Sequence, residues 1–110
     1  MLVPTPLHQD IPLACDLAAI PAEERAAHEL LARQLFDEAA PRREELPDGY
    51  AFQFHASQYP LVAAFIANER LCCPFFRFML EVTPAQGPLW LRLTGDEGVK
   101  EFIQAEFAKV

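Results

Sequence analysis

The sequence has few glycines, few basic residues and no long apolar run, and each shortage excludes a class of protein. Four glycines in 110 residues leave no glycine-rich repeat and no phosphate-binding P-loop pattern. Nine Lys and Arg against 16 Asp and Glu give a net charge of -7, which argues against a nucleic-acid partner and an anionic membrane surface. No apolar run approaches the roughly 20 residues that span a bilayer, so we expect no membrane-spanning segment.

Cysteine is also scarce, with three residues, an odd number that cannot all pair within one chain. Residues 1–10 lack the pattern of a signal peptide, because two prolines, a histidine and an aspartate interrupt them. We therefore expect a cytoplasmic protein whose thiols are reduced by default.

Apolar side chains are abundant, at 52% of the chain with nine Phe, so a core can form without metal or disulfide staples. The length fits one domain over residues 1–110. We expect residues 1–10 to form a loose N-terminal arm, since they carry two prolines and little periodicity.

Periodicity predicts an α+β fold in the order β-α-β-α-β-β-α. We expect a mainly antiparallel sheet of about four strands with helices on one face, and a partly ferredoxin-like unit from residue 50 onward. The expected elements are a strand at 13–17, a helix at 22–39, a charged connection at 41–49, a strand at 50–55, a helix at 58–72, a hairpin of 76–82 with 89–93, and a closing helix after Thr94.

Several local features support these elements. Ser57 is expected to cap the second helix, and Thr94 with Glu97 forms a capping-box pattern before the last helix. The predicted apolar stripe of the first helix consists of Ala27, Leu30, Leu31 and Leu35.

Adjacent cysteines at the end of the second predicted helix carry the clearest chemical signal. Glu69, Cys72 and Cys73 stand at i, i+3 and i+4, so all three can share a helix face. Cys15 reaches the same place if the N-terminal strand passes nearby. Thiolates suit soft ions such as zinc, copper(I) or a mercury-like ion, so these four residues form the predicted metal site.

Two other interpretations of the thiols stay open. Free cysteine is a common core residue, and neighbouring helical side chains diverge by about 100°, so one cysteine can face the core while the other faces solvent. Thiol redox chemistry ranks below metal binding, because the negative end of a helix raises the pKa of a thiol.

Residues 69–75, with the sequence Glu-Arg-Leu-Cys-Cys-Pro-Phe, are followed by matching stretches at 89–95 and 98–102. Together they resemble a group of small bacterial proteins of unassigned function. The similarity extends from about residue 14 to the C-terminus and includes the turn at 47–50. This resemblance implies no particular activity. Such genes sometimes accompany metal-resistance functions, which slightly favours the metal hypothesis.

Two other features of the sequence suggest a site or an interface. His28 and Glu29 begin like a zinc-protease helix motif, but Ala32 stands where the second His belongs, so we expect a solvated His28. Trp90 and Arg92 lie on the face of the last strand opposite its leucines, with Met79 and Arg77 alongside. These four residues form a predicted interface for a homodimer or another partner, and the alternative is that the first helix or the N-terminal arm covers them.

The best-supported function is binding of a soft metal ion, or sensing of thiol-reactive species, through Cys72 and Cys73, with no other cofactor indicated. The alternative is a self-associating or partner-binding module with structural cysteines. We expect a non-enzymatic role and rank a thiol-dependent enzyme third. The sequence names neither the metal nor a small-molecule ligand.

Overall fold

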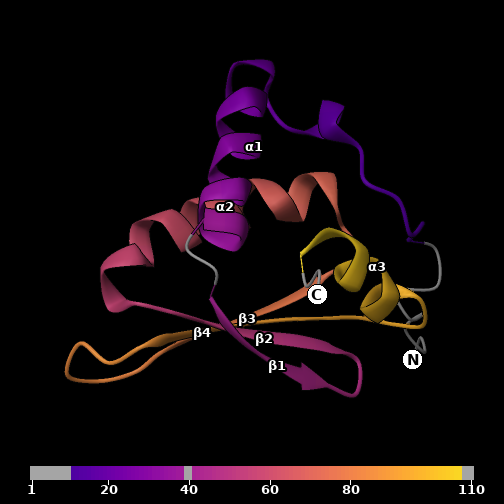
Figure 1. Cartoon of the computed structure of the whole chain (residues 1–110). Coiled ribbons are helices and arrows are strands. Elements are labelled where there is room, and N and C mark those ends of the chain that lie inside the picture. The colour runs from indigo at the N-terminus through magenta and orange to yellow at the C-terminus, as the bar shows by residue number, and fades with distance from the viewer. Residues whose placement is uncertain (1–10, 39–40, 108–110) are drawn as a thin grey trace, which may run out of the picture.

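A four-stranded antiparallel sheet, covered on one face by three helices, organises the chain (Figure 1). The computed structural model describes residues 11–38 and 41–107, and it confirms the α+β class. The predicted N-terminal arm lies outside the described residues. The strands are β1 (Arg42–Leu46), β2 (Gly49–Phe54), β3 (Arg77–Val82) and β4 (Leu89–Thr94), and the α-helices are α1 (Arg25–Arg33), α2 (Tyr59–Cys72) and α3 (Val99–Glu106).

Short helical segments extend or precede these helices. They are η2 (Leu17–Ala19), η3 (Ala22–Glu24), η4 (Gln34–Glu38, a π-helix) and η5 (Ala56–Gln58). The predicted helix at 22–39 therefore corresponds to η3, α1 and η4 in succession.

The sheet has the spatial order β1-β2-β4-β3, and every pair of neighbours is antiparallel. Strand β4 lies between β2 and β3, so β2, α2 and β3 form a split β-α-β unit, which is the ferredoxin-like feature predicted from residue 50 onward. In a complete ferredoxin-like fold, the edge strand next to the position of β2 comes after the last helix of the chain. In this protein β1 occupies that edge position, although it precedes β2 and pairs with it as a hairpin.

Alternation along the strands places one row of apolar side chains under the helices. Phe52 pairs with Leu91, and Leu91 pairs with Leu80, in the sheet register. Phe52, Leu91 and Phe65 of α2 are fully buried. Phe36 lies 5.1 Å, centroid to centroid, from both Phe52 and Phe65 and thereby joins η4 to the sheet and to α2.

The strand predicted at residues 13–17 is wrong. This segment is exposed and enters no sheet ladder, and Asp16 caps η2 by accepting a hydrogen bond from the backbone N–H of Ala18 at 3.0 Å. The backbone N–H of Asp16 donates instead to the carbonyl oxygen of Cys72 at 2.7 Å. The segment is therefore held by the end of α2 and not by a strand.

Strand β1 was missed, because it lies in the stretch predicted as a charged connection. Its first four residues are all charged and exposed, as the outermost strand of a sheet tolerates. It pairs with β2 through a turn at Pro47 and Asp48, the position where the sequence predicts a turn.

The predicted face of the first helix and two predicted caps need correction. Leu30 is 59% exposed and Ala27 is exposed, whereas His28 is only 5% exposed and lies among the core residues. The side chain of His55, not Ser57, caps η5. Thr94 ends β4, and the residue before α3 is Gly98, whose φ of 94° favours glycine.

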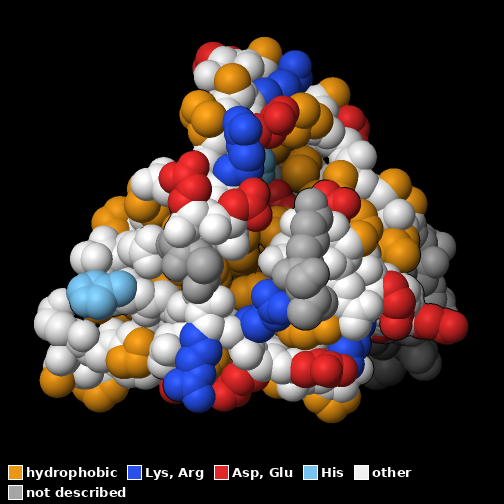
Figure 2. Space-filling view, viewed as in Figure 1, with side chains coloured by type: hydrophobic (Ala, Val, Ile, Leu, Met, Phe, Trp, Pro, Cys, Tyr) orange, Lys and Arg blue, Asp and Glu red, His pale blue; other side chains and the backbone are white. Residues whose placement is uncertain are grey.

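Acidic and basic side chains are interspersed over the face shown in Figure 2, without a broad patch of positive charge. Of the helices that the structure describes, none combines the length and apolar character needed to cross a membrane.

Candidate thiol site

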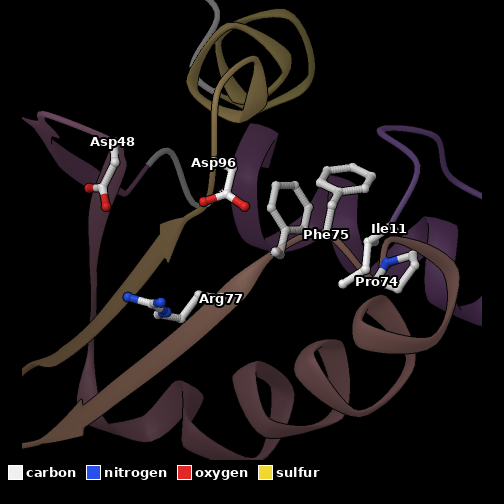
Figure 3. Close-up of a pocket in the computed structure, with 8 residues that line it drawn as sticks. Ile11, Asp48, Pro74, Phe75, Arg77 and Asp96 are labelled. Carbon is white, nitrogen blue, oxygen red and sulfur yellow. The ribbon is translucent and has the colours of Figure 1, made fainter. Parts of the chain in front are cut away.

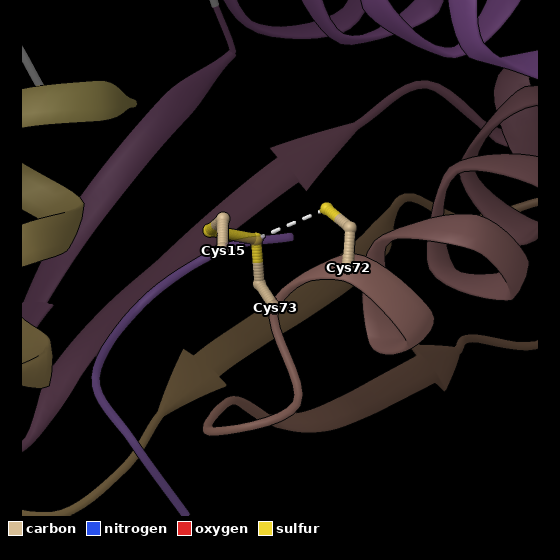
Figure 4. Close-up of side chains that lie close together, drawn as sticks. All are labelled: Cys15, Cys72 and Cys73. Carbon is tan, nitrogen blue, oxygen red and sulfur yellow. Dashed lines mark hydrogen bonds between the residues drawn. A yellow bond between two sulfur atoms is a disulfide. The ribbon is translucent and has the colours of Figure 1, made fainter. Parts of the chain in front are cut away.

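Two segments far apart in sequence meet at the C-terminal end of α2. One is the segment of residues 11–16, and the other is the last turn of α2 with the residue that follows it. A disulfide joins Cys15 to Cys73 across a sequence separation of 58 residues (Figure 4). The hydrogen bond from the backbone N–H of Asp16 to the carbonyl oxygen of Cys72 links the same two segments next to the disulfide.

All three cysteine sulfurs belong to one cluster. Their Sγ atoms lie within 4.8 Å of one another, and the Sγ atoms of Cys72 and Cys73 are 3.2 Å apart. Cys72 is 5% exposed and Cys73 is 2% exposed, whereas Cys15 is exposed. The cluster therefore reaches solvent on the side of Cys15.

The sequence left open that one cysteine of the pair faces the core and the other faces solvent, but in the structure both are buried. Cys73 lies one residue beyond the helix, with φ of -123° and ψ of 73°. The angle of about 100° between neighbouring helical side chains does not apply there. Both sulfurs can therefore turn to the same side.

A buried carboxylate and imidazole lie next to Cys72. The distance from His28 Nε2 to Glu69 Oε1 is 2.7 Å, and both side chains are almost fully buried. The thiol of Cys72 donates to the same carboxylate oxygen at 3.7 Å. His28, Glu69 and Cys72 thus form a second group of ligand-type atoms within 4.8 Å, and it shares Cys72 with the sulfur cluster.

The surroundings of His28 indicate its tautomer. The ring stacks on Phe65 with 5.6 Å between centroids, and Nδ1 is buried with no hydrogen-bond partner among the described residues. A buried N–H without a partner is costly. We therefore assign the N–H of the ring to Nε2, which donates to Glu69.

Burial raises the pKa of the Cys72 thiol from 9.0 to about 12, with the negative charge of Glu69 and the hydrogen bond to it as further causes. The negative charge of Asp16 acts in the same direction. Cys72 is therefore a protonated thiol at neutral pH in this state, and it becomes a thiolate only when something replaces its proton.

A groove of about 670 Å³ is lined in part by Pro74, the residue that follows Cys73 (Figure 3). Ile11 and Pro74, which belong to the two segments joined by the disulfide, line one end of it, and Asp48 lies on the opposite strand hairpin. No cysteine lines this groove. Access to the sulfurs therefore depends on the segment that carries Cys15.

The four residues predicted as metal ligands are divided between the two groups. Cys15, Cys72 and Cys73 lie together, while Glu69 groups with Cys72 and His28. The expectation of a solvated His28 is wrong. Its spacing from Leu31 and Leu35 places it on the buried side of the helix, and this was the signal available in the sequence.

The four residues predicted as an interface alternate along β3 and β4 with the apolar residues that pack under the helices, so they lie on the opposite sheet face. Figure 1 shows the helices gathered on the other side of the sheet. Met79 pairs with Arg92 across the strands and is 51% exposed. Arg77 is exposed and Trp90 is partly exposed, and Arg92 contacts Glu81 at 3.2 Å. No helix that the structure describes covers this face.

No protein-family model, no curated protein and no solved structure matches the chain. The resemblance to small bacterial proteins stays a prediction.

Proposed function

We propose that the protein binds one soft metal ion, of the class of zinc, copper(I) or mercury(II), through the thiolates of Cys72 and Cys73, with Cys15 as the third sulfur. The observation that carries this proposal is the meeting of three Sγ atoms within 4.8 Å of one another. In the disulfide state two of these sulfurs are bonded to each other, so we assign metal binding to the fully reduced protein.

The sulfur spacing supports such a site. With Zn–S bonds of about 2.3 Å and tetrahedral angles, thiolate ligands lie roughly 3.8 Å apart. The Cys72 and Cys73 sulfurs, at 3.2 Å, need only a small separation to reach that distance. Sulfur-rich sites select soft ions over magnesium or calcium, which prefer oxygen ligands.

Glu69 and His28 support the site from behind Cys72. The Glu69 carboxylate is already paired with His28. Of the three cysteines, only Cys72 belongs to the same ligand group as Glu69 among the described residues. We therefore assign Glu69 to orienting Cys72 through the hydrogen bond that it accepts from the thiol, a supporting role typical of groups behind metal ligands. As a carboxylate, Glu69 also remains a candidate fourth ligand.

The proposal places the protein in the cytoplasm, where thiols are kept reduced. All three cysteines are available there as ligands. Sensing of thiol-reactive species would use the same sulfurs, because a soft electrophile and a soft metal ion seek the same thiolates.

Metal titration of the reduced protein tests the proposal. Zinc should be taken up with a stoichiometry of one ion per chain, measured by competition with a chromophoric chelator in the absence of oxygen. Cys72→Ser and Cys73→Ser should each weaken binding about 10- to 100-fold or more, because a thiolate ligand is lost, whereas oxidised protein should bind no zinc.

His55→Gln is the matched control, since His55 is an exposed histidine outside both groups and its loss should leave zinc uptake unchanged. Circular dichroism of each variant would check the fold. Unchanged zinc uptake by a Cys72→Ser/Cys73→Ser double variant would rule the site out.

A second candidate function is self-association through the open sheet face. The specific observation is that Met79 and Trp90 expose apolar surface on a face that no described helix covers. Trp, Met and Arg are enriched at protein interfaces, and this face presents all three. We propose a homodimer through this face as the alternative, with the cysteines then serving as core residues.

A further inference from the structure

The two sulfurs of the disulfide differ sharply in surroundings. Cys73 is 2% exposed, and its sulfur contacts the thiol of Cys72. Cys15 belongs to the exposed segment that lies against the end of α2. Among the described residues, Cys15 is the more exposed partner of the bond, so the side of Cys15 is the open approach for an incoming reagent.

We propose that Cys15 is a modification site, at which a low-molecular-weight thiol exchanges with the disulfide and forms a mixed disulfide on Cys15. Attack at one sulfur of a disulfide is decided by access and by how well the leaving thiolate is stabilised. Here both factors favour attack at the sulfur of Cys15, with Cys73 as the leaving thiolate.

Stabilisation of the leaving group comes from Cys72. While Cys73 is in the disulfide it carries no proton, so in the contact at 3.2 Å only the thiol of Cys72 can donate. When the bond breaks, negative charge forms on Cys73. The S–H of Cys72, which donates to Glu69 while the disulfide is intact, can then turn and donate to the Cys73 thiolate 3.2 Å away. Cys72 is thus a positioning residue for the exchange.

The exchange balances with two molecules of the small thiol. The thiolate of the first attacks Sγ of Cys15, the bond between Cys15 and Cys73 breaks, and Cys73 leaves as a thiolate that is then protonated from solvent. The thiolate of the second attacks the sulfur of the first, so Cys15 leaves as a thiolate and takes a proton. Two small thiols are oxidised to their disulfide, and the protein disulfide is reduced to two thiols.

Exchange at Cys15 would regulate the sulfur cluster. The mixed disulfide withholds one of the three sulfurs, and full reduction returns all three. This consequence alone rests on the proposed metal site, while the exchange itself requires only the disulfide and its surroundings.

Peptide mapping of the oxidised, metal-free protein tests the inference. The protein is treated briefly with limiting glutathione, free thiols are alkylated at low pH, and the chain is cut after Arg with trypsin. Cys15 then lies in residues 1–25, and Cys72 with Cys73 lies in residues 71–77. We expect glutathione on the first peptide and two alkyl groups on the second. Glutathione on residues 71–77, or no linkage between the two peptides before treatment, would overturn the inference.

Variants at Cys72 test its role. Cys72→Ala should slow the first exchange about tenfold, and Cys72→Ser should recover most of the rate, because its hydroxyl can donate to the leaving thiolate. A wild-type rate in Cys72→Ala, or no recovery in Cys72→Ser, would overturn that role. The assay contains no metal and the zinc titration uses reduced protein, so failure of one proposal is distinguishable from failure of the other.

Discussion

At the scale of single residues, the chemistry of the cluster depends on what surrounds Cys72. Its thiol lies between the sulfur of Cys73 and the carboxylate of Glu69, and Glu69 is paired with His28. Burial, and after it the negative charge of Glu69 and the hydrogen bond to it, keep the thiol protonated. A ligand must therefore replace a proton to reach this sulfur, so soft metal binding is expected to strengthen as pH rises.

The raised pKa of Cys72 predicts a specific loss of stability in alkali. In the oxidised protein the pKa of the thiol is about 12 when folded and 9.0 when exposed. Below pH 9 the thiol is protonated in both states, and its contribution is fully present. Above pH 9 the unfolded chain loses the proton first, so the free energy of unfolding should fall as pH rises toward 12. Urea unfolding at several pH values measures this fall.

Cys72→Ser provides the reference for that measurement, since a serine hydroxyl does not titrate in this range and other groups change alike in both proteins. The difference between wild type and Cys72→Ser should shift in favour of the variant above pH 9. A difference that stays constant with pH would contradict the assignment.

At the scale of elements, the end of α2 holds the N-terminal segment in place. Residues 11–16 form no helix or strand, and two links tie them to α2, the disulfide and the hydrogen bond from Asp16 to Cys72. Arg25 fixes the next stretch by donating to the carbonyl oxygens of Ile20 and Ala18. The position of Cys15 is therefore a property of α2 as much as of its own segment.

Loss of the disulfide should destabilise the oxidised protein. The bond closes a loop with a sequence separation of 58 residues, and such a constraint on the unfolded chain is worth about 2–4 kcal/mol. Cys15→Ser should lower the free energy of unfolding by this amount in oxidising buffer, measured by urea denaturation.

Reduced wild-type protein is the matched control, because it lacks the bond but keeps the sulfur of Cys15. In reducing buffer the variant and the wild type should unfold at nearly the same urea concentration. A Cys15→Ser protein as stable as oxidised wild type would contradict the prediction.

At the scale of the whole molecule, the sheet has one covered and one open face. The three helices lie on one side, and the cysteine cluster lies at the end of α2 on that side (Figures 1 and 4). The open face carries Trp90, Arg92, Met79 and Arg77. Metal binding and self-association would therefore use different parts of the molecule and can be tested separately.

A charge on the open face should disrupt a homodimer. Met79→Glu places a carboxylate at the centre of the proposed contact and should shift the sedimentation coefficient to that of a monomer. Leu30→Glu is the matched control, since Leu30 is 59% exposed on α1, away from this face, and its substitution should leave the assembly unchanged. Wild-type protein that sediments as a monomer at every concentration would exclude this interface.

The elements from residue 49 onward were predictable because their patterns are local. Alternation defined β2, β3 and β4, and Pro74 marked the end of α2. The strand β1 was not predictable in this way, since four exposed charged residues carry no alternation and only pairing with β2 makes them a strand. The strand prediction at 13–17 was wrong for the opposite reason. Its apolar residues suggest a strand, but the backbone N–H of Asp16 bonds to the end of α2 and not to a neighbouring strand.

The sequence by itself determined the α+β class, the hairpin of β3 with β4, and the place of the adjacent cysteines at the end of a helix, because periodicity and neighbouring residue types are written along the chain. Only the tertiary structure decided that Cys15 meets Cys73, that His28 is buried against Glu69, and that both adjacent cysteines are enclosed. The residues in these contacts are separated by 41 positions for His28 and Glu69 and by 58 for Cys15 and Cys73. Such contacts depend on how helices and loops pack, and a local sequence pattern does not specify which distant side chain lies beside a thiol.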